Sequence, residues 1–238
     1  MHDKIKAIAA RYLSAKDQIQ TEEGTKTSLI LPFIAALGYD VFNPLEIVPE
    51  FVADIGIKKG EKIDFAVKAG DQVNILIECK WCGSALDHKK ISQLFRYFHT
   101  CKSHVGILTN GLQYHFFADV EEENRMDQSP FFTFDIMSFD ETHLHELQRF
   151  TKQDFDVQSI MAVAKDMKDR AAIKTKLEEY YQQPTDNFVK CILSDLGFSG
   201  MKTQQVINAY MGMHLTPPFC NANVPRYGRR LPEDPNGI

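Results

Sequence analysis

The sequence predicts an α/β fold, in which a mixed central sheet is flanked by helices and followed by a helical C-terminal appendage. Two observations lead to this prediction: apolar residues recur at helical spacing near both ends of the chain, and short β-rich runs fill the region between about 39 and 136. A helical pattern at about 88–102 interrupts those runs. The 238 residues, 44% apolar and 25% charged, suit one large globular domain or a domain with an appendage.

The N-terminal region is expected to form two helices, the first over residues 4–20. The second begins at Thr21, a hydroxyl residue suited to capping, and ends at Gly38. Pro32 is expected to bend it. The strands that we expect next are 39–42, 46–52, 61–68, 73–81, 105–109, 112–120 and 131–136. The tetrapeptide 69–72 and the pair Asn110-Gly111 predict hairpin turns.

Helical patterns return after residue 139. The helices expected there are 140–150, 157–182, 186–196 and 203–214. The last segment, 216–238, holds five of the ten prolines and little periodicity, which predicts a disordered tail. We therefore divide the chain into an α/β domain over 1–138, a helical appendage over 139–215 and the tail.

Charge and composition exclude several classes of protein. The net charge of −5 excludes a uniformly basic, histone-like protein, although residues 54–102 carry nine basic and six acidic residues and could form a local phosphate-binding groove. No apolar run approaches the roughly 18 residues of a membrane span. Five cysteines and the absence of an export signal predict a cytoplasmic protein without a disulfide scaffold or a membrane partner.

The predicted hairpin over 61–81 carries the most informative charges. Folding it back around residue 71 pairs positions whose numbers sum to about 142, which places Asp64 opposite Glu78. Side chains directly opposed across strands lie about 5 Å apart at Cβ. Lys80, two residues after Glu78, points to the same face. Two carboxylates and an ammonium group are therefore expected to converge at one end of the sheet.

Two carboxylates this close repel each other unless a cation lies between them or one of them takes a proton. Asp64, Glu78 and main-chain oxygens are hard ligands of the kind that Mg²⁺ prefers, and Lys80 could orient an attacking water or brace a phosphate. An ordinary ion-paired sheet face explains the same spacing about equally well.

Three further residues could contribute to such a site. Gln93 and Tyr97 lie four positions apart on one face of the 88–102 helix, where they could reach a nucleic acid. Glu23 could add another carboxylate. Each also has a simpler interpretation: Gln93 is solvated, Tyr97 packs partly in the core, and Glu23 complements the helix dipole.

The combination of Asp64, Glu78-Cys79-Lys80 and Gln93-x-x-x-Tyr97 resembles the PD-(D/E)XK nuclease superfamily. It is similar, more narrowly, to the N-terminal nuclease domain of the R subunit of type I restriction enzymes, over residues 20–137. The runs 21–23, 31–33, 37–40 and 107–111 resemble that family as well. The resemblance implies a restriction-endonuclease-like core within 1–138.

The resemblance also implies an activity: Mg²⁺-dependent hydrolysis of DNA phosphodiester bonds by an endonuclease of restriction or phage defence. Asp64, Glu78 and the Cys79 carbonyl would bind Mg²⁺, for which Mn²⁺ could substitute. Lys80 would be the catalytic lysine and Glu23 an auxiliary acid. Gln93 and Tyr97 would contact DNA, and other restriction-system subunits could be partners.

Departures from the pattern and rival interpretations remain. Isoleucine rather than proline precedes Asp64, which removes no ligand. No Gly-x-x-x-x-Gly-Lys-Ser/Thr loop is present, so we expect no ATP site in this chain. One alternative is a nuclease-fold module that binds DNA or protein without cutting. The other is a zinc-stabilised regulatory domain in which Cys79 and Cys82 bind zinc with two of His99, Cys101 and His104.

Overall fold

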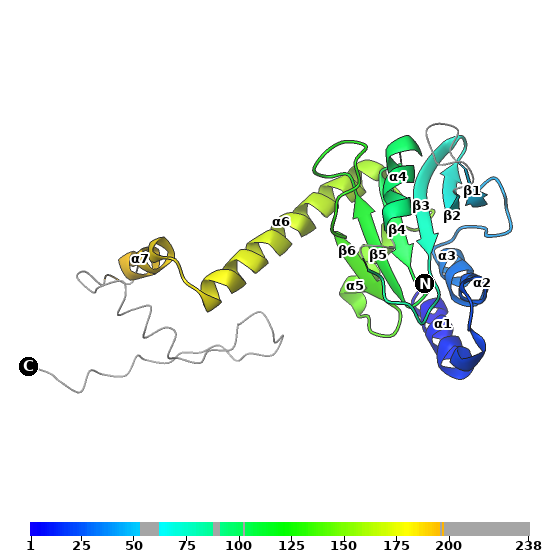
Figure 1. Cartoon of the computed structure of the whole chain (residues 1–238), viewed down its shortest axis with the longest axis horizontal. Helices are drawn as coiled ribbons and strands as arrows, with labels where there is room; N and C mark the ends of the chain where they lie inside the picture. Colours follow the sequence, from blue (N-terminus) through cyan, green and yellow to red (C-terminus); the bar gives the residue numbers. More distant parts are fainter. Residues whose placement is uncertain (53–61, 88–90, 102, 196, 198–238) are drawn as a thin grey trace, which may run out of the picture. The chain divides into compact units, whose positions relative to one another are not determined.

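The computed structural model describes residues 1–52, 62–87, 91–101, 103–195 and 197 (Figure 1). It contains two compact units, Met1–Lys168 and Asp169–Ile238. The first unit holds the sheet and the predicted site, and the second holds the end of the helical region. Each unit is described by itself below.

A six-stranded mixed sheet forms the centre of the first unit. Its strands are β1 (Ile47–Phe51), β2 (Ile63–Ala69), β3 (Gln72–Cys79), β4 (Val105–Thr109), β5 (Gln113–Ala118) and β6 (Phe132–Asp135). They follow the order of the sequence, and every neighbouring pair is antiparallel except β3 and β4. The parallel pair requires a crossover, and α4 (Ser92–Cys101) lies within it. The predicted α/β fold is confirmed.

Five helical segments precede the sheet, and capping, proline and glycine residues lie at or near their boundaries. They are α1 (His2–Ala15), the 3₁₀ turn η1 (Lys16–Gln18), α2 (Glu22–Thr25), the π-helical turn η2 (Lys26–Ile30) and α3 (Leu31–Ala36). Thr21 caps α2 by accepting a hydrogen bond from the Gly24 N–H at 3.0 Å. The π turn ends at Ile30, Pro32 is the second residue of α3, and Gly38 lies beyond the end of α3 with a φ of 94°. The single helix predicted over 21–38 is thus divided into α2, η2 and α3.

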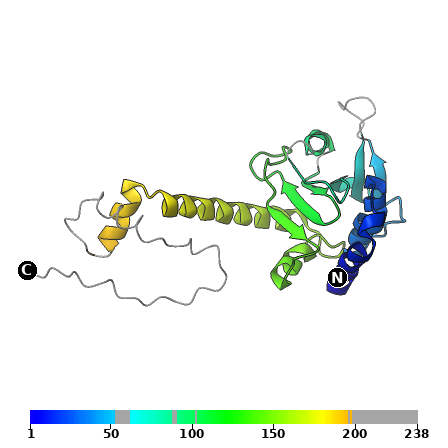
Figure 2. The same cartoon turned by 60° about the horizontal axis from the view of Figure 1, so that its bottom comes forward.

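Helices cover both faces of the sheet, each over its own apolar cluster. On one face, residues from α1, η2, α3 and α5 (Glu141–Gln148) pack with alternate residues of the strands. On the other face, α4 packs on a smaller cluster that includes Ala66 and Leu76. Figure 2 shows α4 and α5 on opposite sides of the sheet. This two-sided burial explains why the central strands are apolar almost throughout.

The strand predicted at 39–42 is wrong. This segment forms turns in which Asp40 Oδ1 accepts a hydrogen bond from the Phe42 N–H at 3.0 Å. Tyr39 is buried and donates its hydroxyl to the Phe150 carbonyl at 3.2 Å. A side-chain oxygen that accepts from a nearby main-chain N–H thus favours a turn over pairing with a neighbouring strand.

The first unit extends past the boundary predicted at residue 138. Leu144, Leu147 and Phe150 are buried in the same cluster as the sheet, and the Phe150 ring lies 4.4 Å from that of Phe116. α6 (Val157–Gln182) begins in this unit and buries Ile160 in the same cluster. The segment 139–168 thus completes the core of the α/β unit.

The described part of the second unit is helical. α7 (Asp186–Asp195) follows the end of α6, and the rings of Tyr180 and Phe188 stack at 4.8 Å. The predicted helix 203–214 and the predicted tail 216–238 lie outside the described residues. No helix in the described part of the chain has the length and apolar character needed to span a membrane.

Candidate active site

The β2–β3 hairpin has the register that the sequence predicts next to the proposed site. Phe65 pairs with Ile77 and Val67 with Ile75, so the residue numbers sum to 142, which places Asp64 opposite Glu78. A β-bulge shifts the register only between Val67 and Lys68, towards the turn. The bulge therefore leaves the end of the hairpin that carries the two acids undisturbed.

The two carboxylates lie in different environments. Asp64 accepts a hydrogen bond at Oδ2 from the Cys79 main-chain N–H, at 2.7 Å. Glu78 is 2% exposed, and its Oε1 lies 2.6 Å from Lys80 Nζ. Its other oxygen, Oε2, is buried and has no hydrogen-bond partner among the described residues. A buried oxygen without a partner is costly, so this atom marks a place where a ligand would be favourable.

Burial and neighbouring charges shift the acid–base properties of this cluster. Burial, followed by the charge of Asp64, raises the pKa of Glu78 to about 7. Burial is the largest single effect on Lys80 and lowers its pKa, but the hydrogen bond to Glu78 and the surrounding carboxylate charges together outweigh burial and raise the pKa. Glu78 can therefore change its protonation state near neutral pH, while Lys80 remains a cation.

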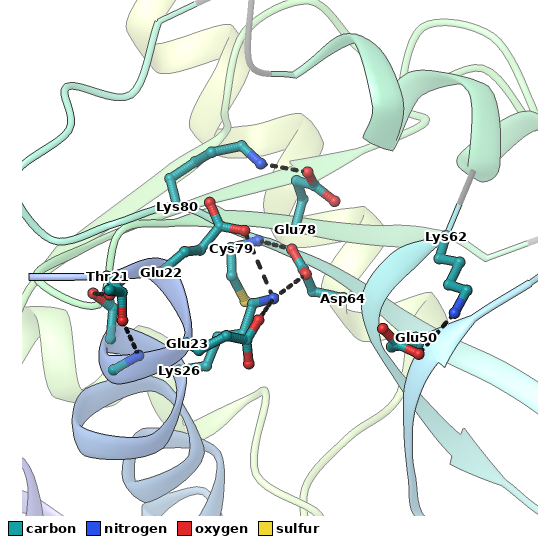
Figure 3. Close-up of polar contacts among 12 residues, drawn as sticks. Thr21, Glu22, Glu23, Lys26, Glu50, Lys62, Asp64, Glu78, Cys79 and Lys80 are labelled. Atoms are coloured by element: carbon teal, nitrogen blue, oxygen red, sulfur yellow. Dashed lines mark hydrogen bonds and ion pairs between the residues drawn. The ribbon is translucent and has the colours of Figure 1, made fainter. Parts of the chain in front are cut away.

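Lys26 is a member of the cluster that the sequence did not reveal. It is the first residue of η2, and its Nζ lies 2.5 Å from Asp64 Oδ1 (Figure 3). Burial alone would lower the pKa of Lys26, but hydrogen bonds to Asp64 and Glu23 raise it above its ordinary value. In the sequence, Lys26 follows Glu22 and Glu23 at the spacing of an ordinary ion pair within a helix. That spacing gives no indication that Lys26 contacts Asp64, which lies 38 positions further along the chain.

Two glutamates of α2 lie next to this lysine. Glu23 Oε1 is 2.6 Å from Lys26 Nζ, and the side chain of Glu23 is 80% exposed. Glu22 Oε1 is 3.6 Å from the same atom, and the charge of Glu22 contributes to the raised pKa of Glu78. The predicted auxiliary acid Glu23 is thus connected to Asp64 through Lys26.

The two residues predicted to contact DNA both belong to α4, which packs on the sheet. The Gln93 amide donates a hydrogen bond to the Lys62 main-chain carbonyl and ties α4 to the start of β2. Tyr97 is fully buried beneath α4, at 0% exposed. The structure gives both residues a role in packing α4, and their contact with DNA stays a prediction.

The Cys-x-x-Cys motif lies beside the site but faces the protein interior. Cys79 is completely buried, as its strand register predicts, and burial raises the pKa of its thiol well above the ordinary value. Cys82 is also buried, and both cysteines are free. Among the residues that the structure describes, no group of three or more His, Cys, Asp or Glu side chains is arranged to hold a metal ion. The predicted Mg²⁺ site has two such side chains, completed by a main-chain carbonyl.

One of the comparisons with known proteins matches part of the chain. Residues 21–130 match the family model described as type I restriction enzyme R protein N terminus. The resemblance predicted from the sequence is confirmed over this segment, which contains Glu23, Lys26, Asp64, Glu78 and Lys80. The match and the helix-flanked mixed sheet are consistent with a restriction-endonuclease-like fold and a restriction-related, nuclease-like role. Searches of curated proteins and of solved structures gave no match.

Proposed function

We propose that this protein is a metal-dependent endonuclease that hydrolyses phosphodiester bonds of DNA in a restriction or phage-defence system. The observation that carries the proposal is the buried Oε2 of Glu78, which has no partner in the part of the chain that the structure describes and lies beside Asp64 and Lys80. These residues lie in the segment that matches the restriction family. The ion pair with Lys80 by itself lowers the pKa of Glu78 and satisfies only Oε1, so it accounts for neither the raised pKa nor the oxygen without a partner among the described residues.

The chemistry of the donors suits Mg²⁺, with Mn²⁺ as a substitute. Carboxylate oxygens of Asp64 and Glu78 are hard ligands, and the predicted Cys79 carbonyl would be a third. When bound, a divalent ion would neutralise charge on the scissile phosphate and lower the pKa of a bound water. The like charges of Asp64 and Glu78 would then no longer oppose each other.

Lys80 has two tasks in this proposal. Its Nζ donates to Glu78 Oε1 at 2.6 Å, which leaves Oε2 as the free oxygen of that carboxylate. The ammonium group also remains protonated at neutral pH, because its pKa is raised. It can therefore hold a water or a phosphate oxygen by donating a second hydrogen bond.

In this proposal the protein acts in the cytoplasm. It binds DNA, and other subunits of a restriction system are its protein partners. The 238 residues of the sequence contain no phosphate-binding loop of the Walker type, so we propose no ATP-driven step for them.

The direct test is cleavage of supercoiled and linear DNA with and without Mg²⁺. Glu78→Ala and Lys80→Ala should each abolish cutting while they retain the wild-type circular dichroism spectrum. Glu123→Ala, which removes an exposed acid of the 121–123 loop, is the matched control and should cut normally.

Equal cutting by the wild type and the Glu78 variant would refute the proposal. DNA binding by the wild type in Mg²⁺ without any cutting would instead favour the alternative, a nuclease-fold module that binds without cleaving.

A further inference from the structure

Lys26 occupies the centre of a group of three carboxylates that belong to two elements. Its side chain is 12% exposed, and Nζ lies 2.5 Å from Asp64 Oδ1 on β2 and 2.6 Å from Glu23 Oε1 on α2. Glu22 Oε1 lies further away, at 3.6 Å. Figure 3 shows the amine between the helix and the strand hairpin. A single movable cation thus has acceptors on two sides.

The acceptors on these two sides differ in their exposure. The Asp64 side chain is 16% exposed, so its contact with Lys26 is largely shielded from solvent. The Glu23 side chain is 80% exposed, and an ion pair with such a group contributes little by itself. Asp64 is therefore the principal partner of Lys26 in this structure. Glu23 is a second, solvent-exposed acceptor for the Lys26 ammonium group, and its ion pair is weaker.

The occupied oxygens of the site determine which contact has to change when a cation binds. Glu78 offers its unpartnered Oε2, but both oxygens of Asp64 have partners. The partner of Oδ2 is the main-chain N–H of Cys79, which is fixed at the end of β3. The partner of Oδ1 is the flexible side chain of Lys26. Of the two, only the lysine can leave without a change in the sheet.

We propose that Lys26 is a positioning residue that serves as an internal counter-ion of Asp64. A divalent cation would displace the Lys26 amine from Asp64, and Glu23 would then hold that amine. This inference rests on the proposed metal-dependent function and extends it to the metal-free state. It assigns Glu23 a role through Lys26 in place of direct metal ligation. The site would remain folded without metal because Lys26 offsets the charge of Asp64 beside buried Glu78.

The first test measures the affinity for Mg²⁺ by titration calorimetry and for Mn²⁺ by electron paramagnetic resonance. Lys26→Gln removes the competing cation and should bind both ions about tenfold or more tightly than the wild type, since one nearby charge shifts the affinity of a carboxylate for a proton by a similar factor. Lys26→Arg keeps the charge and should bind no more tightly than the wild type. Lys4→Gln removes an exposed lysine of α1 and is the matched control.

A double-mutant cycle separates a role of Glu23 through Lys26 from direct ligation. Glu23→Gln should weaken Mn²⁺ binding in the wild-type background, because Lys26 then has only Glu22 to receive it. The same substitution should have no effect in the Lys26→Gln background. If Glu23 were itself a ligand, it would weaken binding equally in both. Lys26→Met, of similar length, repeats the cycle if the Gln variant does not fold.

The outcomes distinguish this inference from the proposed function. Unchanged or weaker metal binding by Lys26→Gln, or an effect of Glu23→Gln that persists without the lysine, would overturn the inference even if the wild type cuts DNA. Tighter binding by Lys26→Gln together with no cleavage by the wild type would refute the nuclease and leave the counter-ion role intact. Absence of metal binding in every variant would refute both.

Discussion

Replacing Glu78 with Gln should stabilise the folded protein at neutral pH, although it removes a proposed metal ligand. Glu78 is 2% exposed, and burial followed by the charge of Asp64 raises its pKa from 4.5 to about 7. A rise of this size corresponds to about 3 kcal/mol of lost stability once Glu78 is ionised in the folded protein. The pKa of about 7 already includes the ion pair with Lys80, so the substitution removes that whole cost. The buried Gln amide adds N–H donors that need acceptors, so the net gain should be about 1–2 kcal/mol at pH 8.

The sign of the pH dependence follows from the direction of the shift. Because the pKa of Glu78 is higher in the folded protein than in the unfolded chain, the folded protein retains the proton between about pH 4.5 and 7. The contribution to stability is therefore complete below about 4.5 and is lost as the pH rises through about 7. The advantage of Glu78→Gln should be large at pH 8 and mostly absent at pH 5.

Thermal unfolding without divalent ions measures this difference. At pH 8 the Gln variant should melt about 2–8 °C above the wild type, since each kcal/mol shifts the melting temperature of a chain of this size by about 2–4 °C. Glu123→Gln, at an exposed position, should leave the melting temperature unchanged at both pH values. An equal effect of Glu78→Gln at pH 5 and pH 8, or a loss of stability at pH 8, would refute the assignment of Glu78 as a destabilising buried carboxylate.

Three substitutions test the packing of the first unit by urea unfolding. Phe150→Ala should cost about 3–5 kcal/mol, because the ring is buried against the sheet; a cost below 1 kcal/mol would place 139–168 outside this core. Gly111→Ala should cost about 1–3 kcal/mol more than Gly70→Ala. Both glycines have a positive φ, so the backbone strain is similar. A Cβ at Gly111 would lie 2.9 Å from a side-chain carbon of α2, whereas a Cβ at Gly70 would meet nothing within 4 Å. Equal costs would contradict that close approach. Asp127→Ala should cost about 2–4 kcal/mol, because it leaves Lys168 and two main-chain N–H groups without their buried acceptor, and wild-type stability would contradict this.

The hairpin that carries the site is predictable from the sequence, because the alternation of apolar residues along its two strands and the position of the turn allow only one register. Alternation along β2 and β3, together with the turn at 69–72, fixes the pairing of Asp64 with Glu78 and turns Cys79 inward. The bulge opposite Val67 and Lys68 is not predictable in this way, because one extra residue changes no pattern beyond its own neighbours. It places Val73 in the cluster beneath α4, whereas Ile75 and Ile77 lie in the other cluster, although simple alternation along the strand would put all three on one face.

The remaining differences arise from tertiary contacts. Lys26 reaches Asp64 only because α2 and the hairpin meet in the folded unit, and nothing in the local sequence specifies that meeting. Tyr97 carries a polar hydroxyl suited to a surface contact, yet the apolar stripe of α4 turns its whole ring into the core. Helical periodicity after residue 139 identifies α5 correctly but cannot tell whether that helix packs on the sheet or forms an appendage.

Anomalous scattering from crystals soaked in Mn²⁺ tests the central claim most directly. One strong peak should lie within about 2.3 Å of a carboxylate oxygen of Asp64 and of Glu78 Oε2, with Lys26 Nζ moved from Asp64 towards Glu23. A protein that cuts DNA in Mn²⁺ but shows its peak elsewhere, or a peak on one carboxylate alone, would contradict the account.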